Sequence, residues 1–133
     1  MVNDPVMVSL TPPPRRSLVD DLVRPSGTGA APSIPRLDAD RPDVEVAEFL
    51  AGIAHADTGF IARTDDGERA VAVIAATAAA LCGEDIAAAL TRPDADFLRG
   101  LEPPAVTALR DVLLAVETES PETVATALGV LAG

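Results

Sequence analysis

Three side chains on one predicted helix are the strongest candidates for chemistry in this sequence. The helical period places Glu45, Glu48 and His55 on one face. Carboxylates and an imidazole can bind a divalent ion or transfer protons. The same stripe is also the ordinary solvated face of an acidic helix, with His55 near the C-terminus, where positive charge is favoured. We interpret it as a solvated face.

Two pairs of aspartates resemble the acidic pairs that hold magnesium in phosphoryl-transfer sites. Asp38 and Asp40 form one pair, Asp94 and Asp96 the other, and each precedes a predicted helix. Because aspartate is a preferred N-cap, capping explains Asp40 and Asp94 without an ion. We therefore predict no metal site here.

The remaining motifs for catalysis or cofactor binding are weak. The segment 27–29, Gly-Thr-Gly, resembles part of a phosphate-binding loop, but it follows no predicted strand and leads toward Pro32. Cys82 ends an apolar run, where cysteine is most often a core residue. We expect no catalytic residue, no cofactor and no metal, so the chain is not predicted to be an enzyme by itself.

The charge of the chain is strongly negative and unevenly distributed. The net charge is −11, and the five acidic and five basic residues up to Pro42 cancel, which leaves the whole excess on the remainder. An acidic body repels phosphate backbones and anionic lipid surfaces. We expect no direct binding to nucleic acid and none to membranes.

Cysteine content and hydropathy bear on the cellular setting. A single cysteine excludes an intramolecular disulfide, and no signal-peptide pattern is visible at the start. The longest uncharged apolar stretch, 70–82, is too short to cross a bilayer. These features predict a soluble, cytoplasmic protein.

The first 39 residues are rich in proline and are predicted to form a flexible, mostly extended arm. A short amphipathic island at 17–24 interrupts this arm. Its apolar side chains would share one face of a helix that needs a surface to fold on, and they are Leu18, Val19, Leu22 and Val23.

Residues 40–133 are predicted to form an acidic helical domain. A helix capped at Asp40 should run to about Asp57, and further helices are expected over 84–91, after Asp94, over 105–117, and from Ser120 to Leu131. The predicted fold is all-α, a compact bundle of five or six short helices behind the arm.

The segment from Phe60 to Val71 allows two interpretations. It could be a β-hairpin that turns at Asp66-Gly67, or Asp65 could cap a helix that continues to Cys82. Because alanine-rich runs favour helices, we prefer a helix over about 66–82. It carries no charge after Arg69, so it should be surrounded by other elements.

Three features indicate binding to another protein. They are the island at 17–24, a flat alanine face on the 66–82 helix, and an apolar residue on the polar side of the 105–117 helix. The predicted partner-binding residues are Leu18, Val19, Leu22, Val23, Ala72, Ala76, Ala79 and Leu114.

The leading hypothesis is therefore a non-enzymatic adaptor or assembly subunit, which docks through the arm and an apolar helix face onto a protein partner, in a hetero-complex or a homo-oligomer. One alternative is an accessory, non-catalytic subunit of a multi-subunit enzyme. Another is an acidic decoy that inhibits a basic nucleic-acid-binding protein.

Overall fold

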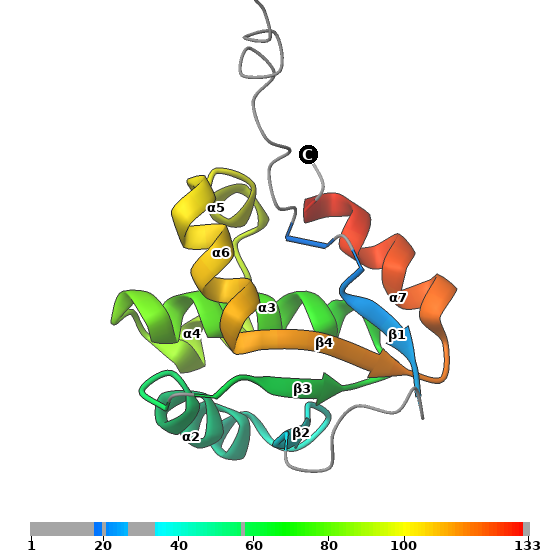
Figure 1. Ribbon diagram of the computed structural model, residues 1–133, viewed down its shortest axis with the longest axis horizontal. Coiled ribbons are helices and arrows are strands. Elements are labelled where there is room, and N and C mark those ends of the chain that lie inside the picture. Colours follow the sequence, from blue (N-terminus) through cyan, green and yellow to red (C-terminus); the bar gives the residue numbers. More distant parts are fainter. Residues whose placement is uncertain (1–17, 20, 27–33, 57, 132–133) are drawn as a thin grey trace, which may run out of the picture.

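A four-stranded parallel β-sheet lies at the centre of the protein, with helices packed against it (Figure 1). The computed structural model describes residues 18–19, 21–26, 34–56 and 58–131. The strands are β1 (Val23–Pro25), β2 (Arg36–Asp38), β3 (Phe60–Arg63) and β4 (Leu113–Thr118). Their order across the sheet is β1-β4-β3-β2, and every neighbouring pair is parallel.

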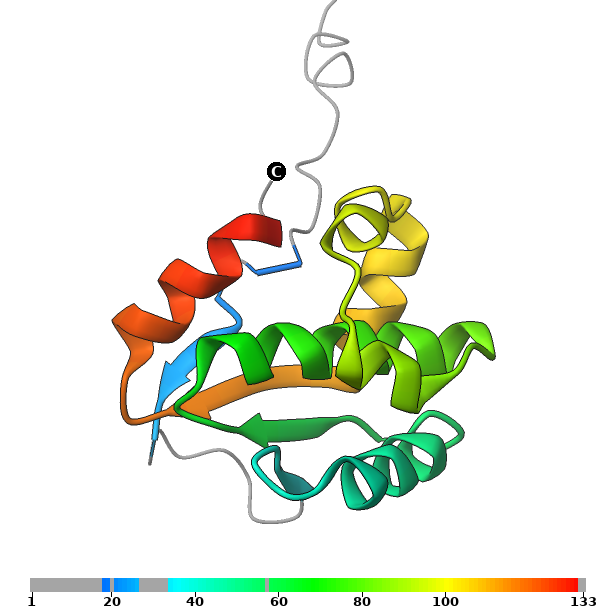
Figure 2. The same ribbon diagram turned by 180° about the vertical axis from the view of Figure 1, so that it is seen from behind.

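The helices are inserted between these strands. α2 (Asp43–Ile53) joins β2 to β3, and α3 (Gly67–Cys82), α4 (Ile86–Thr91), α5 (Ala95–Arg99) and α6 (Pro103–Val112) lie between β3 and β4. α7 (Pro121–Leu128) and the 3₁₀ turn η1 (Gly129–Leu131) follow β4. α3 lies against one face of the sheet, between α2 on the β2 side and α7 on the β1 side (Figures 1 and 2).

α3 begins and ends at clear sequence signals. The side chain of Asp66 caps its first turn by accepting a hydrogen bond from the Glu68 amide at 2.9 Å. At the other end, Gly83 adopts a left-handed conformation with φ of 73°, which suits glycine. Ten of its sixteen residues are buried, so this helix is surrounded, as its lack of charge predicted.

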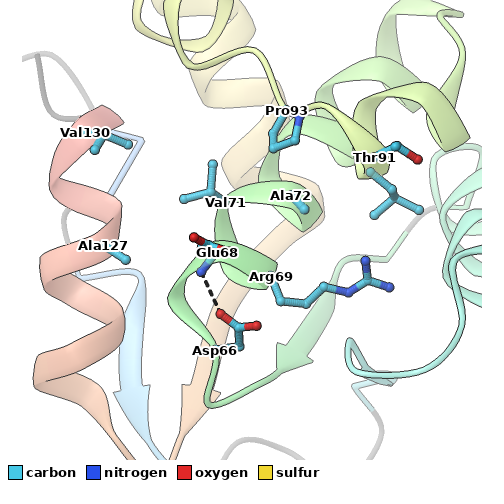
Figure 3. Close-up of a pocket in the computed structure, with 10 residues that line it drawn as sticks. Asp66, Glu68, Arg69, Val71, Ala72, Thr91, Pro93, Ala127 and Val130 are labelled. Atoms are coloured by element: carbon cyan, nitrogen blue, oxygen red, sulfur yellow. Dashed lines mark hydrogen bonds between the residues drawn. The ribbon is translucent and has the colours of Figure 1, made fainter.

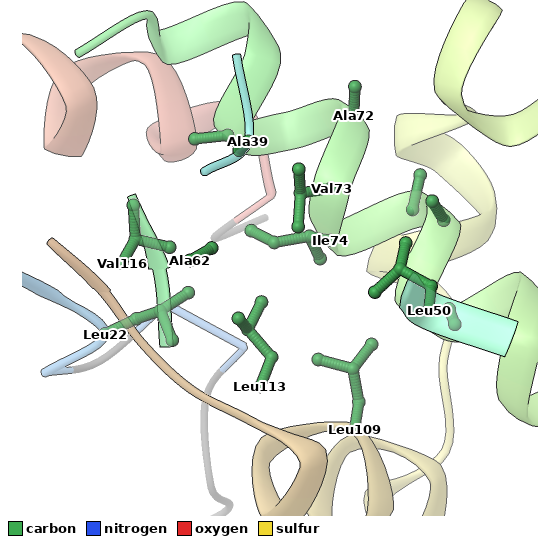
Figure 4. Packing of buried hydrophobic residues seen from close by; sticks show 14 of the residues in the cluster. Leu22, Ala39, Leu50, Ala62, Ala72, Val73, Ile74, Leu109, Leu113 and Val116 are labelled. Carbon is green, nitrogen blue, oxygen red and sulfur yellow. The ribbon is translucent and has the colours of Figure 1, made fainter. Parts of the chain in front are cut away.

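The core lies between α3 and the sheet (Figure 4). Alternate residues of a strand face opposite sides, and Ala62 and Val116 face α3 on the central strands. They meet Val73 and Ile74 of α3 in a cluster of fully buried side chains. Phe60 is the largest of these, and its ring packs edge-to-face on Phe49 with centroids 5.2 Å apart.

The opposite face of the sheet carries an ion pair across the strands. Ile61 and Ala115 are paired in the register and are both buried. Two residues after Ala115 on the same face, Glu117 is 6% exposed. Its carboxylate accepts a hydrogen bond at 3.4 Å from Arg36 of β2, which lies on the far side of β3. This pair connects two strands that are not neighbours in the sheet.

The all-α helical bundle predicted from the sequence is wrong. The predicted helix over 105–117 ends at Val112, and its second half is β4. Residues 113–118 read Leu-Leu-Ala-Val-Glu-Thr and are buried on both sides, and periodicity cannot distinguish such a run from a buried helix. Helical spacing therefore fitted a segment that forms a central strand.

The alternative hairpin over Phe60 to Val71 is also wrong, although half of it is a strand. Phe60–Arg63 forms β3, but it pairs in parallel with β2 and β4 rather than with the residues that follow it. Those residues begin α3, as the preferred interpretation stated. Asp66, not Asp65, is the cap.

Several predicted helices are confirmed with shifted bounds. α5 is capped by Asp94, and α7 starts at Pro121. α2 starts at Asp43 without a side-chain cap, so the predicted cap at Asp40 is wrong. Two strands, β1 and β2, lie within residues 1–39, which the sequence analysis assigned to an arm. Arm residues before Leu18 lie outside the described residues.

Phe60→Ala should lower the free energy of unfolding by about 3–5 kcal/mol, because it removes a ring that is fully buried between α3 and the sheet. Phe97→Ala is the matched control, since that ring is 47% exposed, and it should cost less than about 1 kcal/mol. Urea titration of both variants measures the difference. Equal losses would contradict the position of the core described here.

Candidate functional site

The carboxyl ends of the strands are the first candidate for a site, because ligands of open parallel sheets bind beyond that edge. Here the loops after β2 and β3 are joined by their own side chains. The Thr64 hydroxyl donates to the Asp40 carboxylate at 2.7 Å and accepts from the Asp66 amide at 3.0 Å. Thr64 is fully buried, so this contact fixes the turn from β3 into α3.

Asp65 connects the loop after β3 with the loop after β4. Its carboxylate accepts hydrogen bonds from the Glu119 amide at 2.7 Å and from the Thr118 hydroxyl at 2.9 Å. These two hydrogen bonds, with a smaller contribution from the nearby Arg63 guanidinium, lower the pKa of Asp65 below its usual 3.8. The carboxylate therefore serves as an acceptor that holds two loops together.

Arg69 of α3 holds the loop after β2 in the same way, through hydrogen bonds. Its guanidinium donates to the Ala39 carbonyl at 2.5 Å, to the Arg41 carbonyl at 2.8 Å and to the Asp43 carboxylate at 2.8 Å. These contacts use all three nitrogens of the guanidinium. The polar groups at this edge thus form a latch, defined here as Asp40, Thr64, Asp65, Arg69 and Thr118.

The side chains proposed for chemistry do not converge. Glu45, Glu48 and His55 are exposed on or just after α2, and Glu45 pairs with Arg41 at 3.0 Å. Asp94 caps α5, and Asp96 pairs with Arg99. Within the described residues, no three His, Cys, Asp or Glu side chains gather as metal ligands would. Cys82 is exposed, so its interpretation as a core residue is wrong.

A hollow of about 600 Å³ lies on the outer side of α3 (Figure 3). We call it the first hollow. Val71 and Ala72 of α3 form its floor, and Ala127 of α7 and Val130 of η1 form one wall. Leu90, Thr91 and Pro93 form the other wall. Val130 is 52% exposed, which makes it an accessible apolar contact at the rim.

Local packing explains why the first hollow exists. At the start of α3, Gly67 lies against Ala127 so closely that a Cβ on Gly67 would collide with it. α7 then runs at an angle to α3 (Figure 2), and the small side chains of this part of α3 do not fill the space that opens toward Val130. Alanine on a helix thus leaves room that larger residues would occupy.

The polar groups around the first hollow are mostly acidic or already paired. Arg69 is committed to the latch, and the Thr91 hydroxyl donates to the Ala87 carbonyl at 3.0 Å. Asp66 uses one carboxylate oxygen for the cap, and Glu68 is exposed beside it. The hollow therefore presents an apolar floor with two carboxylates at its mouth.

A second hollow of about 410 Å³ follows further along α3, and residues 92–94 pass between the two. Ala75 and Ala79 form its floor, and the exposed ring of Phe97 lines its wall. Three acidic residues and one arginine surround it, namely Glu84, Asp85, Asp94 and Arg92. Both hollows thus combine an apolar floor with a predominantly acidic rim.

The structure separates the predicted partner-binding residues into three groups. Ala72 lines the first hollow and Ala79 the second, whereas Ala76 is fully buried in the core. Leu114 is half-buried on β4, next to Gly59. The island residues lie in or against the core, with Leu18 and Leu22 buried and Val19 and Val23 partly buried.

The walls of the first hollow were not predicted from the sequence. Ala127 and Val130 belong to the helix predicted from Ser120 to Leu131, but neither was among the predicted binding residues. No local signal identifies them, because they meet α3 only through the crossing of α7. The alanine face of α3 was the available signal, and it identified one residue in each floor.

Comparisons with known proteins found no match to this chain. No family model matches the sequence, no curated protein matches it, and no solved structure matches the fold. None of the helices in the described part of the chain has both the length and the apolar character needed to cross a membrane.

Asp65→Asn should destabilise the protein at neutral pH, because the amide lacks the charge that the Glu119 and Thr118 hydrogen bonds stabilise. Since the pKa of Asp65 is lowered on folding, its contribution is complete above about pH 4 and is lost as the pH falls through the pKa of the folded state.

Urea unfolding between pH 7 and pH 3 measures this dependence. The difference between the wild type and Asp65→Asn should shrink below about pH 4. Glu48→Gln on α2 changes the net charge by the same amount and is expected to keep the wild-type profile. A difference that stays constant with pH would contradict the assigned role of Asp65.

Proposed function

We propose that this chain is a non-enzymatic protein-binding module, an adaptor or assembly subunit, which holds a basic, amphipathic segment of a partner against the outer side of α3. The observation that carries the proposal is the first hollow, with its apolar floor, the exposed Val130 and the carboxylates of Asp66 and Glu68. Grooves of this kind receive apolar side chains of an incoming helix or peptide.

The chemistry of the hollow favours a peptide over a small anionic ligand. Its volume of about 600 Å³ lies within the range of small-molecule sites, so size alone does not decide. An anionic ligand would need a free donor, and the guanidinium of Arg69 is occupied by three partners. Apolar surface beside carboxylates instead complements aliphatic side chains accompanied by Lys or Arg.

Long-range charge supports the same class of partner. After Pro42 the chain carries sixteen acidic residues and five arginines, so its body attracts basic segments before contact is made. Association should be faster at low salt, whereas the apolar contact should persist at high salt. This combination distinguishes a module of this type from a purely electrostatic decoy.

The proposal shifts the docking surface relative to the sequence hypothesis. Leu18 and Leu22 contribute to the core of this chain, so we place the contact on the α3 side, at Val71, Ala72 and Val130. No described feature favours the accessory-subunit hypothesis or the decoy hypothesis over this one, and both remain predictions.

Val130→Glu should abolish partner capture, because it adds a carboxylate to an apolar wall that already faces Glu68 and Asp66. Val44→Glu is the matched control, since Val44 is 66% exposed on α2 and lines neither hollow. Immobilised wild type and both variants are incubated with cell extract at low and high salt, and the retained proteins are quantified by mass spectrometry.

We expect to find a partner protein that the wild type and Val44→Glu retain in equal amounts. Val130→Glu should retain at least about tenfold less of it, which corresponds to a loss of roughly 1.4 kcal/mol of binding free energy. Thermal unfolding of the three proteins establishes that both variants are folded. Identical retention by all three would exclude the first hollow as the docking site.

A further inference from the structure

The two hollows lie next to each other along α3 and are separated by a narrow stretch of backbone. Pro93 lines the first hollow, whereas its neighbours Arg92 and Asp94 line the second. The connection from α4 to α5 therefore crosses over α3 as a ridge between the two hollows (Figure 2). Two openings that share one ridge can receive a single ligand that spans both.

The spacing of the two floors is determined by α3 itself. The floor of the first hollow lies at Val71 and Ala72, and the floor of the second lies at Ala75 and Ala79. Ala72 and Ala79 are two helical turns apart, which is about 10.5 Å at roughly 1.5 Å per residue. They face the same side of α3, so a ligand that fills both hollows needs two apolar groups at about this separation.

The exposed apolar side chains at the two hollows are held in place relative to one another. Val130 lines the first hollow and Phe97 lines the second, and both are about half exposed. The Arg99 guanidinium of α5 donates a hydrogen bond to the Val130 carbonyl of η1 at 2.8 Å. The helix that carries Phe97 is thus joined to the turn that carries Val130. Binding to contacts that are already formed costs less entropy.

The rims of the two hollows are predominantly acidic. Two guanidinium groups are outnumbered there by five carboxylates, which are those of Asp66, Glu68, Glu84, Asp85 and Asp94. The three aspartates cap helices through one carboxylate oxygen, Oδ1, so the other oxygen can accept a hydrogen bond from a partner. A ligand with Lys or Arg on either side of its apolar groups complements this arrangement.

Resting on the proposed function, we propose that the partner segment is a basic amphipathic α-helix that places one large apolar side chain in each hollow, at positions i and i+7. These positions share one face of a helix and are about 10.5 Å apart, which equals the spacing of the floors. Positions i+3 and i+4 of the same face cross the ridge at Pro93, so they carry small residues. Lys and Arg on the flanks pair with the carboxylates of the rims.

An extended partner does not match the spacing of the floors. Side chains on one face of a β-strand recur about every 6.7 Å, so they lie about 6.7 or 13.4 Å apart rather than about 10.5 Å. A polyproline helix repeats at about 9.3 Å, but the grooves that recognise it are lined by aromatic rings. Among the described residues that line the two hollows, Phe97 is the one aromatic. An α-helix is therefore the favoured occupant.

The probes are synthetic, lysine-rich helical peptides of about eighteen residues, a length at which an isolated helix forms. The test peptide carries leucine at i and i+7 and alanine at i+3 and i+4. The control peptide has the same composition, but its second leucine is exchanged with the alanine at i+4, so its leucines are about 6 Å apart. Isothermal titration with the full chain measures both affinities. The test peptide should bind at least about tenfold more tightly, because the control peptide can fill one hollow only.

Variants of the chain test each hollow separately. Phe97→Ser should weaken binding of the test peptide about tenfold and Val130→Ser about fivefold, because each removes apolar surface from one hollow. Serine is neutral, so the charge of the rims does not change. Val44→Ser is the matched control, since Val44 is exposed and lines neither hollow, and it should bind as the wild type does. Thermal unfolding establishes that all three variants are folded.

Methyl NMR of the full chain shows whether one peptide fills both hollows. The test peptide should shift the signals of Val71 in the first hollow and Ala79 in the second over the same range of peptide concentration. The signals of Val46 and Val116, which are fully buried in the core, should stay in place. The titration should end at one peptide per chain.

The outcomes separate the two-hollow helix from the proposed function. Equal affinities for the two peptides, or a Phe97→Ser chain that binds the test peptide as the wild type does, overturn the two-hollow helix. Partner capture that is lost in Val130→Glu would still stand, because it depends on the first hollow alone. Two peptides bound per chain also overturn the two-hollow helix, because each hollow would then act by itself.

A proline at i+5 of the test peptide examines the conformation of the occupant. This position points away from the two leucines, and proline in the interior of a helix breaks it. The proline peptide should bind at least about tenfold more weakly than the test peptide. Unchanged affinity would show that the occupant is not helical and would overturn the proposal.

Discussion

The close approach of one alanine-rich helix to a parallel sheet is the constraint on which the rest of the structure depends. α3 has small or β-branched residues at most of its buried positions, and it lies directly over the strands that contribute Ala62 and Val116. α2, α4 and α7 all pack against α3, so its position determines theirs. With only three phenylalanines in the chain, the core relies on close packing of small side chains rather than on large rings.

The same small side chains link the packing of the core to the proposed binding surface. On its inner side, α3 buries alanines against the sheet, and on its outer side Ala72, Ala75 and Ala79 form the floors of two hollows. Neighbouring helices can approach an alanine face closely at one point, as α7 does at Gly67, but they cannot fill the space once they diverge. A surface suited to apolar side chains thus follows from the composition of the helix.

Polar residues at the carboxyl edge of the sheet hold its loops together. Such an edge is the usual binding site of parallel sheets, but here Thr64, Asp65 and Arg69 bind the loops that follow β2, β3 and β4 to one another. Fixing these loops also fixes the start of α3 and of α7. The latch therefore determines how the two helices cross, and with it the shape of the first hollow.

The sequence by itself determined the helices that have local signals. Gly83, Asp94 and Pro121 mark helix ends through their own hydrogen bonds or backbone angles, and the lack of charge along α3 was enough to predict that it is surrounded. The acidic charge of the body and the alanines in the floors of the hollows could also be read directly. These features depend on residues a few positions apart.

Only the tertiary structure decided the sheet and the walls of the hollow. β1 and β2 are three residues long and contain proline or arginine, and they are strands because β4 and β3, distant in the chain, pair with them. Leu113–Thr118 fits a helix by its spacing, yet it fills the central place between β1 and β3. Val130 meets α3 only because of how α7 crosses it. Contacts between distant segments carry no local pattern, and for that reason the sequence could not reveal them.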